Sequence, residues 1–293
     1  MKNYSLILLI AFCFLLSIYM FYTPLEQPRN TPLTIHVGIL PDEDVNKLHQ
    51  RYDSFLKYLS KEIGIEFKLV IPASYTELLQ MFGSHRVDLA YFGGLTFLKA
   101  NILFHAEPLV MREVDSRFTS WFIVKKDNTA QNLREFKNKS FSFGSALSTS
   151  GHLMPRYFMQ IEKNIIPEDF FSKVQYSNTH DNTVYLVRDR VVDLGVANSE
   201  IIKRMISDGR LHKNDIRILW ETPPYPDYVW AIHSHFNDKL KISLRNAFLK
   251  LDFQNTVQRK ILSKMGTESF LPTETNDFIS LKKIAKSLEL LEK

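Results

Sequence analysis

The sequence predicts an α/β fold with two lobes, and three observations support this prediction. Short apolar segments alternate with amphipathic helical patterns, as expected for strands whose faces are covered by helices. The alternation comes in two series, separated by the charged stretch at residues 125–127. About 263 of the 293 residues remain after the first thirty, which look like a targeting segment, and this leaves room for two domains of roughly 100–150 residues each.

Composition excludes several classes of protein. Hydrophobic residues make up 45% of the chain and glycine occurs only 10 times, so the chain is neither disordered nor collagen-like. The net charge of +5 comes from 37 basic and 32 acidic side chains spread along the chain, without a basic stripe. We therefore expect no nucleic-acid partner. Cys13 is the only cysteine, so the rest of the chain has no thiol for catalysis, a disulfide or a Cys-rich zinc site.

The N-terminal apolar segment directs the chain to a membrane. Residues 5–22 carry no charge and follow Lys2, and 18 helical residues span about 27 Å, nearly the thickness of the hydrocarbon layer. The segment ends in the bulky residues 19–22 instead of a small-residue cleavage site, which favours a retained transmembrane anchor. The alternatives are a cleaved signal peptide and lipidation of Cys13, although Phe12 stands where lipoprotein signals have a small residue. In each case the remainder of the chain is exported.

The first series begins after a polar, proline-bearing linker at residues 26–32. Apolar runs predict strands, and a 3.6-residue period predicts helices. Ser74 followed by Glu77 forms a capping box that marks the start of one helix. The predicted strands cover residues 33–39, 66–71 and 87–92, and the predicted helices cover residues 45–63, 74–82 and 95–101.

The second series follows the charged stretch and repeats the pattern, so we expect largely parallel pairing of strands. Predicted strands cover residues 140–143, 174–176 and 192–196, and predicted helices cover residues 150–163, a segment after 180, and 199–207. Prolines within residues 223–226 end the pattern. An extended stretch at residues 228–233 and three helices near residues 237–251, 255–264 and 277–290 close the chain.

The most specific stretch is a cluster of three hydroxyl side chains, Ser148, Thr149 and Ser150, between a predicted strand and the next helix. Free backbone N–H groups and the positive end of the helix dipole meet at such a helix start, and the hydroxyls add donors. The stretch therefore predicts an anion site. The alternative is that Ser148 or Ser150 only caps the helix.

Histidines and aspartates offer further candidates. His180 and Asp181 open another helix, where His180 would donate to the same crevice; the alternative is a surface histidine beside a capping aspartate. We expect no Ser-His-Asp hydrolase, because the sequence has no G-x-S-x-G elbow. His233 and His235 share one face of a strand, but two imidazoles without a nearby acidic or cysteine partner predict no metal site.

Two tyrosines occupy matching places in the first series. Tyr75 lies in the first turn of a predicted helix and Tyr91 near the end of a predicted strand. Open α/β sheets bind ligands at the carboxyl ends of their strands, so both hydroxyls are candidates to cover a small polar ligand. The alternative is that both are ordinary core aromatics among 12 Tyr and 22 Phe.

The order of these segments resembles the periplasmic phosphonate- and phosphate-type solute-binding proteins of ABC importers. The likeness covers nearly all of residues 33–290, and the Ser-Thr-Ser-Gly segment followed by His-Asp is its most specific part. The matching segments are residues 38–41, Tyr52, 55–59, 87–93, 148–152 and 180–181.

The resemblance implies a type II periplasmic-binding fold, which is a clamshell of two lobes. After an N-terminal helix and linker at residues 1–31, one lobe would comprise residues 32–121 plus 229–293 and the other residues 122–228. It also implies ligand-binding roles: the oxyanion would be held by Ser148, Thr149, Ser150 and His180, with Tyr75 and Tyr91 closing over it.

The resemblance adds two acidic candidates, Glu200 and Asp227. They match the segments that meet the ammonium group of the ligand in aminophosphonate-binding members of the family. The alternatives are a glutamate that stabilises a helix N-terminus and a turn aspartate after proline.

The expected function is capture without chemistry. A phosphonate or related phosphorus oxyanion would bind between the lobes of an exported, extracytoplasmic protein, favour closure, and be presented to an ABC permease. We expect no enzyme activity, no cofactor and no metal. The membrane would be a further partner through residues 5–22. Two alternatives are an anchored ligand-sensing module for a signalling partner and an exported phosphate-ester hydrolase.

Overall fold

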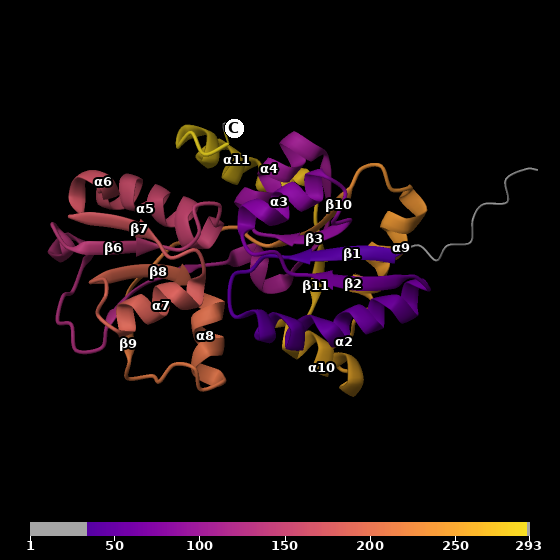
Figure 1. Cartoon of the computed structure of the whole chain (residues 1–293), viewed down its shortest axis with the longest axis horizontal. Helices are drawn as coiled ribbons and strands as arrows, with labels where there is room; N and C mark the ends of the chain where they lie inside the picture. Colours follow the sequence, from indigo (N-terminus) through magenta and orange to yellow (C-terminus); the bar gives the residue numbers. More distant parts are fainter. Residues whose placement is uncertain (1–33, 292–293) are drawn as a thin grey trace, which may run out of the picture. The chain divides into compact units, whose positions relative to one another are not determined.

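The computed structural model describes residues 34–291, in which strands and helices alternate (Figure 1). The strands are β1 (Thr34–Ile39), β2 (Glu66–Val70), β3 (Leu89–Phe92), β4 (Ala106–Arg112), β5 (Ser120–Lys125), β6 (Ser140–Phe143), β7 (Lys173–Tyr176), β8 (Leu194–Asn198), β9 (Ile216–Glu221), β10 (Val229–His233) and β11 (Phe270–Pro272). The α-helices are α2 (Val45–Ile63), α3 (Tyr75–Gly83), α4 (Gly94–Phe104), α5 (Met154–Lys163), α6 (Pro167–Phe170), α7 (His180–Arg188), α8 (Ser199–Ser207), α9 (Asp238–Leu249), α10 (Thr256–Met265) and α11 (Ile279–Ser287). The predicted membrane segment at residues 5–22 lies outside the described residues, and no helix within residues 34–291 has the length and apolar character of a membrane span.

Six strands form the first sheet, in the order β11-β4-β10-β3-β1-β2. In Figure 1, α2 and α10 lie on one side of this sheet, and α3 and α4 lie on the other. Helix α2 shows why these helices form: Leu48, Tyr52, Phe55 and Leu59 recur at helical spacing and are all buried. The helix starts at the cap of Asp44 and ends at a left-handed glycine.

Five strands form the second sheet, in the order β7-β6-β8-β5-β9. It has its own buried core, in which Phe122, Phe141 and Phe143 are fully enclosed. We call the two sheets with their helices the first lobe and the second lobe. The presence of two separate α/β sheets agrees with the predicted fold class.

The prediction of largely parallel pairing is wrong. Within residues 34–291, four strand pairs are parallel (β1 with β2 and β3, β6 with β7 and β8). Five pairs are antiparallel, and each of them involves β5, β10 or β4. Four strands, β4, β5, β9 and β11, were not predicted from the sequence. Strands β5 and β10 enter their sheets directly from a crossing between the lobes, so no crossover helix forces them into parallel pairing.

Two segments connect the lobes, at residues 113–119 and 222–228. They lie side by side, because Phe118 and Tyr225 exchange backbone hydrogen bonds of 2.8 and 3.0 Å. The predicted lobe limits stay a prediction, and the limit between residues 121 and 122 falls inside β5.

Candidate functional site

The predicted anion site forms a tight turn after β6. The Ser148 hydroxyl caps this turn by accepting a hydrogen bond of 2.9 Å from the Gly151 N–H. The turn is π-helical, η3 (Thr149–Leu153), and continues into α5. Its first intrahelical bond is the one that Leu153 donates to the Ser148 carbonyl, so the N–H groups of Thr149 and Ser150 precede the intrahelical ladder. π-Helical turns are frequent at functional sites.

The start of α4 in the first lobe faces this turn. The Leu95 N–H donates to the Thr149 hydroxyl at 2.9 Å, and the Gly94 N–H donates to Asp227 Oδ1 at 3.1 Å. A β-carbon at Gly94 would lie 2.4 Å from Leu281 Cδ2, so a larger residue would require the Leu281 side chain to shift. Two helix N-termini from different lobes therefore meet at one place, where the positive ends of both dipoles favour an anion.

His180 lies at the same place as a neutral hydrogen-bond donor. Its backbone N–H donates to the Asp42 carbonyl at 2.9 Å, and its Nδ1 accepts from the Asn198 N–H at 3.2 Å. Burial lowers the pKa of His180 to about 3, so the ring is neutral at pH 7 and carries its hydrogen on Nε2. Nε2 lies 3.5 Å from the Ser148 hydroxyl. The ring thus presents an N–H toward the Ser148 hydroxyl, at the place where the sequence predicts an anion.

Two buried carboxyl groups flank the turn. Burial raises the pKa of Asp227 to about 7, although the Gly94 N–H and the Thr149 hydroxyl oppose the rise. Burial and the charge of Glu43 raise the pKa of Asp42 to about 6. Asp42 Oδ2 accepts from the Tyr228 hydroxyl at 2.9 Å. Both carboxyl groups can therefore hold a proton near neutral pH and can either donate to or accept from a ligand.

Four buried polar atoms of this group have no hydrogen-bond partner within residues 34–291. They are Asp42 Oδ1, the Tyr75 hydroxyl, the Ser150 hydroxyl and Asp227 Oδ2. Burial and the charges of Asp42 and Asp227 hold the pKa of Tyr75 well above its usual value, and the nearby Ser148 and Tyr228 hydroxyls oppose the rise only in part. Buried polar atoms normally have partners, so a polar ligand bound here would supply the partners that these atoms lack.

Tyr91 contributes its ring to this region, while its hydroxyl is used elsewhere. The hydroxyl donates to Asp115 at 2.7 Å, and Asp115 also forms a two-pronged ion pair with Arg112. The ring stacks on Tyr228 with centroids 5.1 Å apart. The expectation that the Tyr91 hydroxyl covers the ligand therefore has no support in these contacts.

Glu200 is not brought to this group. Its carboxylate pairs with Lys203 one helical turn away at 2.7 Å, and 21% of its side chain is exposed. Glu200 therefore matches the alternative interpretation, a glutamate in the first turn of a helix. Asp227, in contrast, is fully buried beside the hydroxyl turn.

The sequence analysis missed Asp42, Tyr228 and the N–H groups that begin α4. Asp42 follows the carboxyl end of β1, and open α/β sheets bind ligands at such ends. Its position in the sequence could therefore have identified it as a candidate. Tyr228 offered no signal, because only the folded chain places its hydroxyl between Asp42 and Asn198.

A second polar group joins the lobes beside the site. Glu43 is fully buried and receives hydrogen bonds from Arg51 of its own lobe and from Arg204 and Arg210 of the other lobe, the last two at 3.2 and 3.0 Å. Burial alone would raise the pKa of Glu43, but the guanidinium groups outweigh it and lower the pKa to about 2. The ion pairs across the boundary therefore persist over the whole working pH range. Asp44 adds a contact, as its N–H donates to Asp181 at 3.0 Å.

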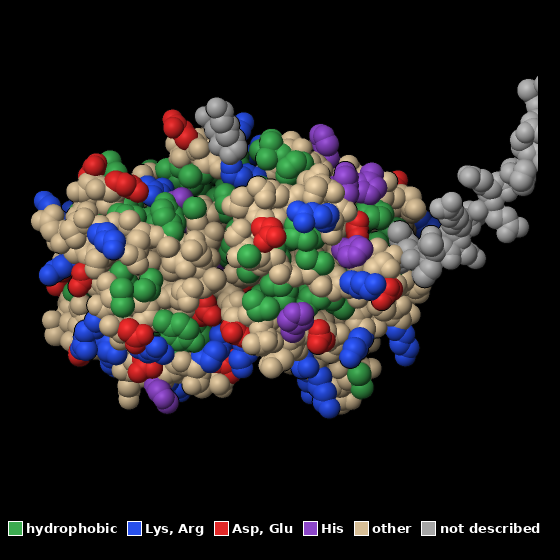
Figure 2. Space-filling view, viewed as in Figure 1, with side chains coloured by type: hydrophobic (Ala, Val, Ile, Leu, Met, Phe, Trp, Pro, Cys, Tyr) green, Lys and Arg blue, Asp and Glu red, His purple; other side chains and the backbone are tan. Residues whose placement is uncertain are grey.

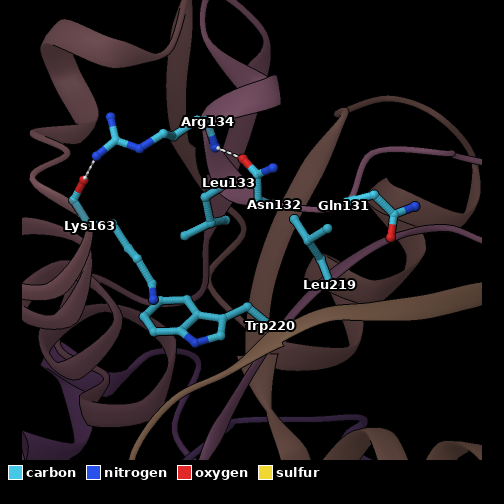
Figure 3. A pocket seen from close by; sticks show the side chains of 7 residues that line it. All are labelled: Gln131, Asn132, Leu133, Arg134, Lys163, Leu219 and Trp220. Carbon is cyan, nitrogen blue, oxygen red and sulfur yellow. Dashed lines mark hydrogen bonds between the residues drawn. The ribbon is translucent and has the colours of Figure 1, made fainter.

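A hollow of about 320 Å³ lies in the second lobe, away from this site (Figure 3). The Lys163 ammonium group sits 4.6 Å from the centre of the Trp220 ring, and Arg134 donates to the Lys163 carbonyl. Leu133 and Leu219 complete an apolar lining. None of the predicted site residues lines this hollow.

Comparison with known proteins gives one consistent result. The sequence model of a family described as "ABC transporter, phosphonate, periplasmic substrate-binding protein" matches residues 37–278. The chain is 28% identical over 287 residues to the probable ABC transporter phosphite binding protein PhnD1 of Prochlorococcus marinus, covering 94% of this chain and 97% of the relative. It is 22% identical over 297 residues to the phosphonates-binding periplasmic protein of Escherichia coli, covering 98% of this chain and 86% of the relative.

Solved structures agree with these relatives. The structure of PhnD1 from Prochlorococcus marinus in complex with methylphosphonate matches with a TM-score of 0.82 and 28% identity, over 88% of this chain and 99% of that chain. A binding protein component of an ABC phosphonate transporter from Pseudomonas aeruginosa matches with a TM-score of 0.79 and 22% identity, over 88% of this chain and 87% of that chain. These matches confirm the predicted two-lobe α/β fold.

Proposed function

The chain belongs to the periplasmic phosphonate substrate-binding family of ABC transporters, and we propose that it captures a protonated phosphorus oxyanion between Ser148–Ser150, His180, Tyr75, Asp42 and Asp227. The family consists of extracytoplasmic binding proteins that serve importers, so the chain is a carrier of its ligand and not a phosphate-ester hydrolase. The observation that supports the ligand class is the group of four unpartnered polar atoms at the hydroxyl turn.

The mixture of donors and acceptors selects the protonation state of the ligand. The Ser150 and Tyr75 hydroxyls and the His180 Nε2–H are donors to anionic oxygens. The two carboxyl groups repel a fully ionised anion, unless a proton lies between carboxyl and ligand oxygen. A phosphonate or phosphite near pH 7 carries or accepts such a proton, whereas sulfate has none to share. The relatives named for phosphite and phosphonates bind ligands of this kind.

Calorimetry tests this proposal with methylphosphonate, phosphite, phosphate and sulfate at equal ionic strength. We expect binding of at least one phosphorus oxyanion and much weaker binding of sulfate, because sulfate brings no proton and both carboxyl groups would have to be protonated to accommodate it. Sulfate binding as tight as that of the best phosphorus oxyanion would contradict the proposed site.

The proposal also gives Asp227 a role in binding an ammonium group on the ligand. Asp227 and Asp42, in place of Glu200, are the carboxyl groups placed to meet an ammonium group on the ligand. If they do, Asp227→Asn should weaken binding of an aminoalkylphosphonate more than binding of an alkylphosphonate of equal length. Equal losses would assign Asp227 to the oxyanion alone.

We propose that residues 5–22 anchor the protein in the cytoplasmic membrane, because these 18 residues are uncharged and end in bulky side chains. An alkaline carbonate wash of membranes should leave the full-length chain in the pellet. Release into the supernatant, with an N-terminus that begins after this segment, would show that it is a cleaved signal peptide.

A further inference from the structure

Three histidines meet at the end of β10 that lies farthest from Asp227. His233 ends β10, His235 follows two residues later, and His85 comes from the loop between α3 and β3. Their ring centroids are 4.5 to 5.1 Å apart. One nitrogen from each ring lies within 4.8 Å of the others, and this is the one such group of metal-ligating side chains within residues 34–291. Figure 2 shows histidine side chains gathered on the first lobe.

His233 is already oriented as metal-bound histidines are. Its Nε2 lies 2.8 Å from the Phe82 carbonyl oxygen, which can only accept a hydrogen bond, so Nε2 carries the hydrogen. The ring also stacks on Phe82 with centroids 3.7 Å apart. With its hydrogen on Nε2, the neutral ring holds a free electron pair on Nδ1. A backbone carbonyl that receives the second ring N–H is the usual support of a metal-binding histidine.

The same carbonyl oxygen also positions the third histidine. The backbone N–H of His85 donates to Phe82 O at 3.0 Å, and His85 adopts a left-handed conformation with φ of 57°. Phe82 thus fixes both the His233 ring and the backbone that carries His85. The His85 and His235 side chains are exposed, so their rings can rotate to close the remaining gap. Nitrogens of a tetrahedral zinc site lie about 3.3 Å apart, given zinc–nitrogen distances of roughly 2.0–2.1 Å.

We propose that His85, His233 and His235 bind a divalent transition-metal ion such as Zn²⁺, with water as the fourth ligand. Three neutral imidazoles without a carboxylate suit Zn²⁺, Cu²⁺ or Ni²⁺ and disfavour Mg²⁺ and Ca²⁺, which prefer oxygen ligands. In the sequence, His233 and His235 have no third ligand nearby. Strand β10 pairs with β3, and this pairing brings the loop before β3, which holds His85, beside them.

Zinc titration of the full-length, tag-free protein tests this site, after removal of metals by a chelator. We expect one Zn²⁺ ion to bind, excess Mg²⁺ to leave the binding unchanged, and bound Co²⁺ to give the absorption spectrum of a tetrahedral site. His85→Ala and His235→Ala should each weaken Zn²⁺ binding roughly tenfold or more.

The control is His49→Ala, which removes an exposed histidine of α2 that pairs only with Asp53. This variant should bind Zn²⁺ as the unmodified chain does, and all three variants should keep their affinity for methylphosphonate, which shows that they are folded. No Zn²⁺ binding at millimolar concentration, or equal Zn²⁺ affinity in His85→Ala, His235→Ala and the unmodified chain, would overturn the proposal. Neither result would affect the phosphorus oxyanion site.

Discussion

At the scale of the single residue, one backbone contact decides which ring nitrogen of His180 can donate a hydrogen bond. The Asn198 N–H occupies Nδ1, and burial keeps the ring neutral. The hydrogen must then sit on Nε2, which faces the hydroxyl turn. A donor without charge is thereby available to an anion at every working pH.

The first prediction is that His180→Ala weakens methylphosphonate binding by roughly 10- to 100-fold, the effect of losing a hydrogen bond to a charged ligand. Calorimetry measures the dissociation constant. His49→Ala is a suitable control, because His49 lies on the exposed face of α2 beside Asp53, outside the hydroxyl turn. An unchanged dissociation constant for a folded His180→Ala variant would remove His180 from the site.

The second prediction concerns the pH dependence of stability in the ligand-free protein. Burial raises the pKa of Asp227 from 3.8 to about 7, so between these values the folded chain holds a proton that the unfolded chain has lost. The contribution of Asp227 to stability is therefore present below about pH 4 and is lost as pH rises to 7. His180 has the opposite sign, because its lowered pKa costs stability as pH falls below 6.5.

Asp227→Asn should remove the pH-dependent contribution of Asp227 to stability and leave that of His180 unchanged. In urea unfolding from pH 5 to pH 8, the unmodified chain should lose stability relative to Asp227→Asn as pH rises. Asp53→Asn, at an exposed position of α2, should follow the unmodified chain. Parallel curves for all three proteins would mean that Asp227 is ionised throughout this range.

At the scale of the element, the packing of β1 decides where Asp42 lies. Gly38 is in β1, and a β-carbon there would lie 2.4 Å from Leu78 Cδ1 of α3 and 2.7 Å from Val87 Cγ1. Helix α3 approaches the strand closely because this side chain is absent. Asp42 follows β1 by three residues, so a displaced strand would also displace this carboxyl group.

The third prediction is that Gly38→Ala lowers the free energy of unfolding by about 1–3 kcal/mol, the usual effect of overpacking a core. It should also weaken methylphosphonate binding. Lys57→Ala, on the exposed face of α2, is the control and should change neither property. Stability equal to that of the unmodified chain would show that α3 can move away from β1 without strain.

At the scale of the whole molecule, Glu43 couples the lobes. Its carboxylate bonds to Arg51 in one lobe and to Arg204 and Arg210 in the other, so the contacts across the boundary exist only when the lobes meet. The connecting segments at Phe118 and Tyr225 are paired with each other, and we expect the lobes to hinge about them. The affinity for ligand therefore depends on how favourable closure is.

The fourth prediction is that Glu43→Gln raises the methylphosphonate dissociation constant roughly tenfold or more without touching the ligand, because a neutral amide cannot hold the guanidinium groups of both lobes. Calorimetry gives the affinity, and small-angle X-ray scattering gives the compaction that ligand causes. Glu62→Gln is the matched control, because Glu62 pairs with Lys250 within the first lobe. Equal affinity for Glu43→Gln and Glu62→Gln would show that Glu43 does not contribute to closure.

The sequence by itself determined the elements whose local signals are strong. Helix α2 has the bounds that its apolar period predicts, residues 45–63, and α8 has its predicted bounds, residues 199–207. The hydroxyl turn and His180 were predicted from sequence to begin helices, as they do, because the starts of helices can be recognised locally.

Only the tertiary structure decided how distant segments combine. The antiparallel strands β5 and β10 depend on the two crossings between lobes, which leave no periodic signal in the sequence. The Tyr91 hydroxyl donates to Asp115, Glu200 pairs with Lys203, and Asp42 and Asp227 both act on Tyr75 although they are far apart in sequence. The physical reason is that side-chain hydrogen bonds and burial join residues far apart in sequence, whereas the patterns read from sequence report only neighbours along the chain.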